Sequence, residues 1–169
     1  MALTLDGNGT MTVGNGDITG ITRGAIESTA IGAGAVLQVV SNDTVAAFST
    51  ASTSMVSTGI TGSITPTNTS SKILVFVNLG SVYNASTSGQ PRWTLYRGAT
   101  DLASTNGRGL GQIYSASGAM QAHGTGILLD SPATTSATTY TVYVKLNLGT
   151  LQWGSDGGAQ VMILMEIAA

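Results

Sequence analysis

The chain has 169 residues, of which only 8% are charged, against about 25% in an average globular protein. It contains no cysteine, which excludes disulfides and cysteine-ligated zinc. Its six basic residues and net charge of −2 leave no basic stripe of the kind that nucleic acid needs. Serine and threonine make up about a quarter of the chain. This composition favours a protein that packs against copies of itself or against a larger particle, because low charge disfavours a free monomer.

The first 24 residues consist of short alternating segments and glycine-rich turns. Gly7-Asn8-Gly9 recurs as Gly14-Asn15-Gly16, and Asn-Gly supplies the positive φ angles of tight β turns. We expect short strands folded back by these turns or an extended arm, with a flexible tail as the alternative. Since no basic segment followed by an apolar one is present, we expect no secretion signal.

Residues 25–35 are small and show no periodicity, and we interpret them as a linker that completes an N-terminal anchoring arm, residues 1–35. The large apolar side chains of this arm are too widely separated by glycine and polar residues to enclose a core. Each can dock in a pocket of a neighbour while the backbone adds strands to an exposed sheet edge. The predicted anchoring residues are Leu3, Leu5, Met11, Val13, Ile18 and Ile21.

From residue 36 to residue 169 the pattern predicts one domain made of strands. No window shows the i, i+3, i+4, i+7 spacing of an amphipathic helix. We predict strands at 36–40, 44–50, 55–65 (interrupted at Gly59 and Gly62), 72–79, 93–96, 140–148, 152–153 and 161–167. Short strands separated by Gly, Ser, Thr and Asn turns indicate an antiparallel β-sandwich.

Two of these strands, 72–79 and 161–167, are apolar on both faces. A strand with one wet face would alternate between apolar and polar residues, so both strands require cover on two sides. We expect one face to meet the core of the domain and the other to meet a neighbouring subunit. The predicted interface residues are Leu74, Phe76, Met162 and Leu164.

Residues that could carry catalysis are sparse. His123 is the single histidine, and without a Gly-x-Ser-x-Gly motif a Ser-His-Asp hydrolase is disfavoured. The eight carboxylates are all more than five residues apart, although a glycosidase could still bring two together in space. The segment 6–10 resembles the start of a calcium loop but lacks its sixth-position glycine and twelfth-position glutamate. We therefore predict neither an enzyme nor a cofactor or metal site.

Several aromatic and basic residues could together form a surface that binds a ligand. They are Trp93, Tyr96, Tyr114 and Trp153, with Arg92, Arg97 and Arg108 nearby in the sequence. Packing in the core or an interface is the favoured interpretation of the tryptophans, because of the area that they bury. Glu166 is a carboxylate in an apolar strand, and we expect it near solvent or beside Arg92 or Arg97, since an unpaired buried carboxylate is costly.

Several segments resemble a group of small virion proteins of tailed bacteriophages. The strand Ser71-Lys72-Ile73-Leu74-Val75-Phe76-Val77 resembles a strand of the group that begins SSKILV. Further similar segments follow in the order of the group: 1–5, 34–40, 95–100, 129–140 and 163–167. The similarity covers residues 34–169 well and the first part loosely. It implies a jelly-roll sandwich similar to the trimeric jelly rolls of the tumour-necrosis-factor type, and therefore a homotrimer.

The resemblance also implies a structural protein of the virion, made in the host cytoplasm. Its expected partners are copies of itself and other virion proteins, either the major capsid protein or the tail, and a host-surface glycan stays open as a ligand. Two roles compete, a capsid decoration or cement protein and a short tail fibre with a receptor-binding head. The short chain favours decoration, because fibres usually carry a longer shaft. In both roles the arm would anchor the trimer, and we expect neither nucleic-acid binding nor membrane insertion.

Overall fold

The structure is a computed structural model that describes residues 32–44, 47–86, 88–103, 107–154 and 158–169. The chain divides into two units, 1–32 and 33–169, and every element below belongs to the second. The predicted anchoring arm, with its six anchoring residues, lies outside the described residues except for positions 32–35.

The described residues form antiparallel strands and contain no helix, which confirms the prediction of an all-β, sandwich-like domain. The strands are β1 (Val36–Thr44), β2 (Phe48–Thr50), β3 (Val56–Ile64), β4 (Lys72–Asn84), β5 (Arg92–Arg97), β6 (Thr100–Asp101), β7 (Gly111–Gln112), β8 (Met120–Asp130), β9 (Thr138–Lys145), β10 (Leu151–Trp153) and β11 (Gln160–Ile167). None of the described segments forms a helix that could cross a membrane.

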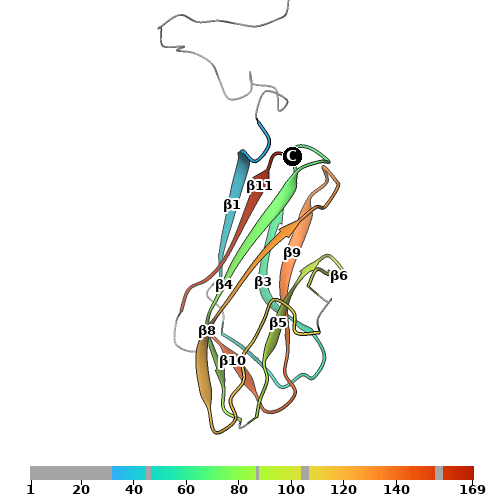
Figure 1. Ribbon diagram of the computed structural model, residues 1–169. Helices are drawn as coiled ribbons and strands as arrows, with labels where there is room; N and C mark the ends of the chain where they lie inside the picture. The colour runs from blue at the N-terminus through green and yellow to red at the C-terminus, as the bar shows by residue number, and fades with distance from the viewer. Residues whose placement is uncertain (1–31, 45–46, 87, 104–106, 155–157) are drawn as a thin grey trace, which may run out of the picture. The chain divides into compact units, whose positions relative to one another are not determined.

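Two sheets make up the domain (Figure 1). The six-stranded sheet has the order β1-β11-β4-β10-β2, with β8 also paired to β4, and the five-stranded sheet has the order β3-β9-β5-β6, with β7 also paired to β5. β4 organises the first sheet, since its two halves pair with β11 and β10 while nearly its whole length pairs with β8. The long strands β3, β4, β5, β8, β9 and β11 alternate between the two sheets along the chain.

Large apolar side chains fill the space between the sheets. Trp93 and Trp153 are 4% and 1% exposed and belong to this core, as the sequence favoured. β9 contributes alternate residues from Tyr140 onward, as predicted, but it ends at Lys145. Leu148, expected to continue the pattern, is exposed. The predicted extension of this strand to residue 148 is therefore wrong.

β8 is the main element that the sequence did not predict. Its core-facing positions include Gly124 and Gly126, so the segment lacks the apolar alternation of a half-buried strand. A Cβ at Gly124 would lie 2.8 Å from Leu79 Cδ1, and one at Gly126 would lie 3.0 Å from Val77 Cγ1. The two glycines therefore make room for the large inward side chains of β4.

The predicted interruptions of the strand at 55–65 are half right. β3 changes register between Ser57 and Thr61, and Gly59 within that bulge has a φ of +82°. Gly62 is an ordinary position of the strand, so an interruption there is wrong. A Cβ at Gly62 would lie 3.1 Å from Met162 Sδ, which means that this glycine serves the packing between the sheets.

Candidate functional site

The outer face of the six-stranded sheet carries a continuous apolar surface. The register aligns Val39, Met165, Leu74 and Leu129 in one row across β1, β11, β4 and β8, and Ser41, Ile163, Phe76 and Ile127 in the next. Ile127 is 63% exposed and Leu129 is 53% exposed. We call the apolar residues of these rows, together with Val161 of β11, the apolar face.

A shallow hollow of about 310 Å³ lies within the apolar face. Phe76, Ile127, Val161 and Ile163 line it, together with the polar side chains of Asn78 and Thr125. The hollow has room for an apolar side chain of another protein surface, since the cores of protein interfaces pack as closely as protein interiors.

The apolar face covers only part of this sheet. Beyond the β4 register shift between Asn78 and Gly80, the outward row contains Ser49, Gln152, Tyr83 and Gln121. Gln121 donates a hydrogen bond to the Ser81 hydroxyl at 2.8 Å. The bulge therefore separates an apolar half from a polar half on one side of one sheet.

The structure divides the four predicted interface residues. Leu74 and Phe76 lie half-buried on the apolar face, but Met162 and Leu164 are 0% exposed in the core of the chain itself. The prediction that Met162 and Leu164 form an interface is therefore wrong. Both faces of β11 are apolar, so its sequence alone could not show which face points inward. The outward residues are Val161, Ile163, Met165 and Ile167.

Glu166 does not lie near solvent or an arginine, as the sequence led us to expect. It is 0% exposed, and its carboxylate accepts hydrogen bonds from Gln38 Nε2 at 2.6 Å and from the Thr67 amide and hydroxyl at 2.7 and 2.8 Å. Burial acts to raise the pKa of Glu166, but the hydrogen bonds from Gln38 and Thr67 oppose it, and the pKa lies below the ordinary 4.5. Neutral donors rather than a cation satisfy this charge.

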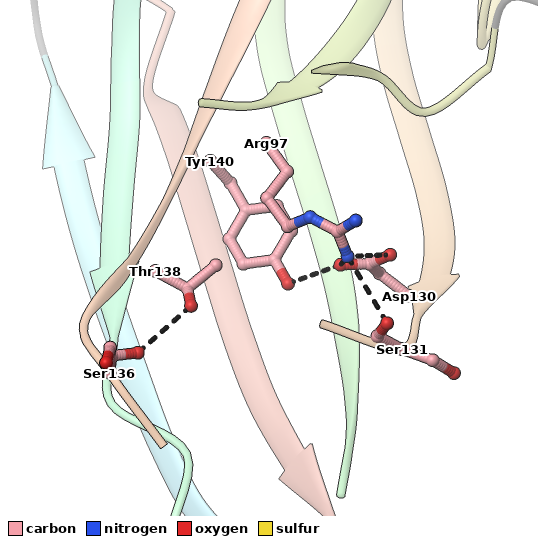
Figure 2. Close-up of polar contacts among 6 residues, drawn as sticks. All are labelled: Arg97, Asp130, Ser131, Ser136, Thr138 and Tyr140. Atoms are coloured by element: carbon pink, nitrogen blue, oxygen red, sulfur yellow. Dashed lines mark hydrogen bonds and ion pairs between the residues drawn. The ribbon is translucent and has the colours of Figure 1, made fainter. Parts of the chain in front are cut away.

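Arg97 instead pairs with Asp130 at the end of β8 (Figure 2). Its Nη1 lies 2.8 and 2.7 Å from the two carboxylate oxygens of Asp130, and the buried Tyr140 hydroxyl donates to Asp130 Oδ2 at 2.7 Å. Burial, the hydrogen bond to Asp130 and the charge of Asp130 raise the pKa of Tyr140 far above 10, although Arg97 opposes them. Arg97 of β5 and Tyr140 of β9 belong to one sheet and Asp130 of β8 to the other, so these contacts link the two sheets.

No catalytic constellation forms within the described part of the chain. His123 lies exposed on β8 and has no hydrogen-bond or ion-pair partner among those residues. No group of three His, Cys, Asp or Glu there could hold a metal ion. The possible calcium loop at 6–10 falls outside the described residues. The apolar face is therefore the strongest candidate functional site.

Comparison with models of known protein families finds no match, and no curated protein matches the chain either. The similarity to phage virion proteins therefore remains a prediction from the sequence.

Proposed function

We propose that this protein is a non-enzymatic structural component of a bacteriophage particle that assembles as a homotrimer through the apolar face. The observation that carries this proposal is the apolar face itself. Monomeric proteins rarely expose contiguous apolar patches larger than a few hundred Å². A second copy of the chain is a suitable cover, because a surface with so few charges offers little electrostatic barrier to self-association.

The strand order supports a jelly roll. The four-strand orders β1-β11-β4-β8 and β3-β9-β5-β7 face each other, and each sheet takes its strands from distant parts of the chain. Two interlocked Greek keys produce this connectivity. The number of three subunits follows from the resemblance to trimeric jelly rolls of the tumour-necrosis-factor type.

Within the particle we favour a capsid decoration or cement protein, with a short tail fibre as the second role. The chain enters β1 beside its own C-terminal end, since the Gly34 amide donates to the Ala168 carbonyl at 2.8 Å. Residues 1–35 therefore connect to the sandwich at this end, and the loop before β5 and the loop after β9 lie at the opposite end (Figure 1). An anchor at residues 1–35 would leave those loops pointing away from the particle.

The assembly part is tested by Ile127→Asp, with Ser63→Asp as the control. Both positions are exposed on sheet surfaces, but Ile127 belongs to the apolar face and Ser63 to the outer face of the other sheet. Ultracentrifugation should find a trimer for the unmodified chain and for Ser63→Asp, and a folded monomer for Ile127→Asp. A monomeric unmodified chain, or a trimeric Ile127→Asp variant, would contradict assembly through this face.

The virion part is tested by adding purified protein to particles that lack it. The full chain should attach, and a chain without residues 1–24 should remain a folded trimer that no longer attaches. Attachment of the truncated trimer would place the contact in the sandwich. Failure of the full chain to attach to capsid or tail would contradict a role in the particle, while leaving the trimer untouched.

A further inference from the structure

A second hollow in the described part of the chain has a volume of about 320 Å³. It is formed by the start of β5, the end of β9 and the loops that adjoin them. Its lining consists of Thr53, Gln90, Arg92, Lys145, Leu146 and Asn147. Two of the six basic residues of the chain meet there, and no carboxylate among the described residues lines the hollow.

Arg92 and Lys145 are direct cross-strand partners in the β5–β9 ladder. Their neighbours Trp93 and Val144 point into the core, so both cations project from the outer face of the five-stranded sheet. Like charges placed directly opposite each other in an antiparallel pair destabilise the sheet. Within the described parts of the chain the only ion pair is that of Arg97 with Asp130. No carboxylate there pairs with Arg92 or Lys145 to offset the repulsion between them.

Neutral groups hold the guanidinium of Arg92 in position. Its Nη2 donates to Gln90 Oε1 at 2.9 Å and its Nη1 donates to the Gly107 carbonyl at 3.2 Å. The backbone amide of Gln90 donates in turn to Asn147 Oδ1 at 2.6 Å. An arginine carries five N–H donors in a rigid fork and a lysine carries three. The hollow therefore presents a pre-oriented cation, and a second cation beside it, without a carboxylate of the described residues to balance them.

We propose that this hollow binds an acidic sugar, with the carboxylate or sulfate of the sugar between Arg92 and Lys145. The amides of Gln90 and Asn147 and the hydroxyl of Thr53 suit the hydroxyl groups of the same ring. This binding requires neither the trimer nor a virion. If the proposed trimer forms, three such sites on one particle component would add avidity.

The test is saturation-transfer NMR on the full chain with three observed probes, glucuronate, glucose 6-sulfate and glucose, and with sodium sulfate, which has no proton to observe, as a competitor. We expect saturation transfer to both anionic sugars and none to glucose at the same concentration. Lys145→Gln and Arg92→Gln should each weaken binding by about tenfold or more, because each removes a charge-assisted contact. Lys145→Arg should retain it. Lys72→Gln is the matched control, since it removes one charge from the other sheet and should leave binding unchanged.

The alternative outcomes are distinct. Equal binding of glucose would show that the cations play no part in binding. Displacement of the anionic sugars by an equal concentration of sodium sulfate would show that the hollow is a simple anion site. Either result overturns the proposal, as does the absence of binding by both anionic sugars. Ultracentrifugation of Lys145→Gln should show an unchanged oligomeric state, so a failure here is separable from a failure of the proposed assembly.

Discussion

The outer faces of the two sheets are built from opposite kinds of side chain. The apolar face presents Val, Leu, Ile, Met and Phe, whereas the five-stranded sheet presents mainly hydroxyls. On that second face Thr61 Oγ1 lies 3.1 Å from Thr141 Oγ1, and Ser63 Oγ lies 2.7 Å from Thr139 Oγ1. Water can satisfy hydroxyl groups but gains nothing from apolar ones. The hydroxyl face therefore suits contact with solvent, and the contrast supports the proposal that protein covers the apolar face.

The contrast is sharpest in two adjacent rows of the six-stranded sheet. One row points outward and is wholly apolar: Val39, Met165, Leu74 and Leu129. The next row points inward and contains Gln38, Glu166, Ile73 and Asp130. The usual distribution of polar and apolar groups is thus inverted at this end of the sheet. The inward carboxylates have partners within the chain, but the outward apolar groups do not have cover within its described parts.

The largest expected effect separates two adjacent residues of β11. Leu164→Asp places an unpaired charge in the core and should prevent folding, because burying such a group costs several kcal/mol. Ile163→Asp places the same charge on the apolar face and should give a folded monomer. Circular dichroism and ultracentrifugation distinguish the two states. A folded trimer of Ile163→Asp would show that the apolar face is not an interface.

The second prediction concerns the inward carboxylate of Glu166. Its folded-state pKa lies below the ordinary 4.5, so ionised Glu166 stabilises the fold above that pH, and this stability is lost as the pH falls through the folded-state pKa. Glu166→Gln should lower the free energy of unfolding at pH 7 by about 1–3 kcal/mol, because an amide nitrogen then faces donors. The difference in the free energy of unfolding between Glu166→Gln and the unmodified chain should be smaller at pH 3 than at pH 7. Urea unfolding at the two pH values measures it.

Asp43→Asn is the control for Glu166→Gln, because Asp43 is an exposed carboxylate of the neighbouring strand β1. It should change stability by less than about 0.5 kcal/mol at both pH values. A Glu166→Gln variant as stable as the unmodified chain at pH 7 would show that the inward row does not depend on this charge.

Sequence reasoning identified most of the strands that have large apolar residues, and its expectation that a neighbouring subunit covers their outer faces stays a prediction. It predicted β11 to within one residue and the first part of β4, because runs of Ile, Val, Leu and Met indicate a strand, but it ended β4 at residue 79 whereas the strand continues to Asn84. It could not orient β11, since a run that is apolar on both faces has no parity signal. It also missed β8, whose inward glycines are meaningful only against Leu79 and Val77.

The polar contacts were beyond sequence reasoning for a different reason. Glu166 and its donor Gln38 are 128 residues apart, and Arg97 and Asp130 are 33 apart. Only the sheet register brings each pair together. The cross-strand neighbours Arg92 and Lys145 likewise become a pair only once β5 is known to lie beside β9.

The third prediction tests the contacts of Asp130 with Arg97 and Tyr140 that link the two sheets. Tyr140→Phe removes one hydrogen bond to Asp130 but leaves the ion pair with Arg97. It should lower the free energy of unfolding by about 0.5–1.5 kcal/mol, the usual net value of one hydrogen bond. Tyr114→Phe, at an exposed position, is the control and should have no measurable effect. Equal stability of Tyr140→Phe and the unmodified chain would show that Arg97 alone satisfies Asp130.

The smallest expected effect comes from making each outer face resemble the other. Thr141→Val gives the hydroxyl face one apolar side chain, and since Val keeps the β-branched shape that strands favour, the free energy of unfolding should change by less than about 0.5 kcal/mol. Phe76→Thr makes the reverse change on the apolar face. It should leave the fold intact but weaken the trimer, so that on dilution the variant dissociates at a higher protein concentration than the unmodified chain does. Sedimentation over a dilution series measures both variants. If Thr141→Val altered assembly as much as Phe76→Thr, the hydroxyl face would also be covered by protein, and the contrast between the two faces would not reflect their neighbours.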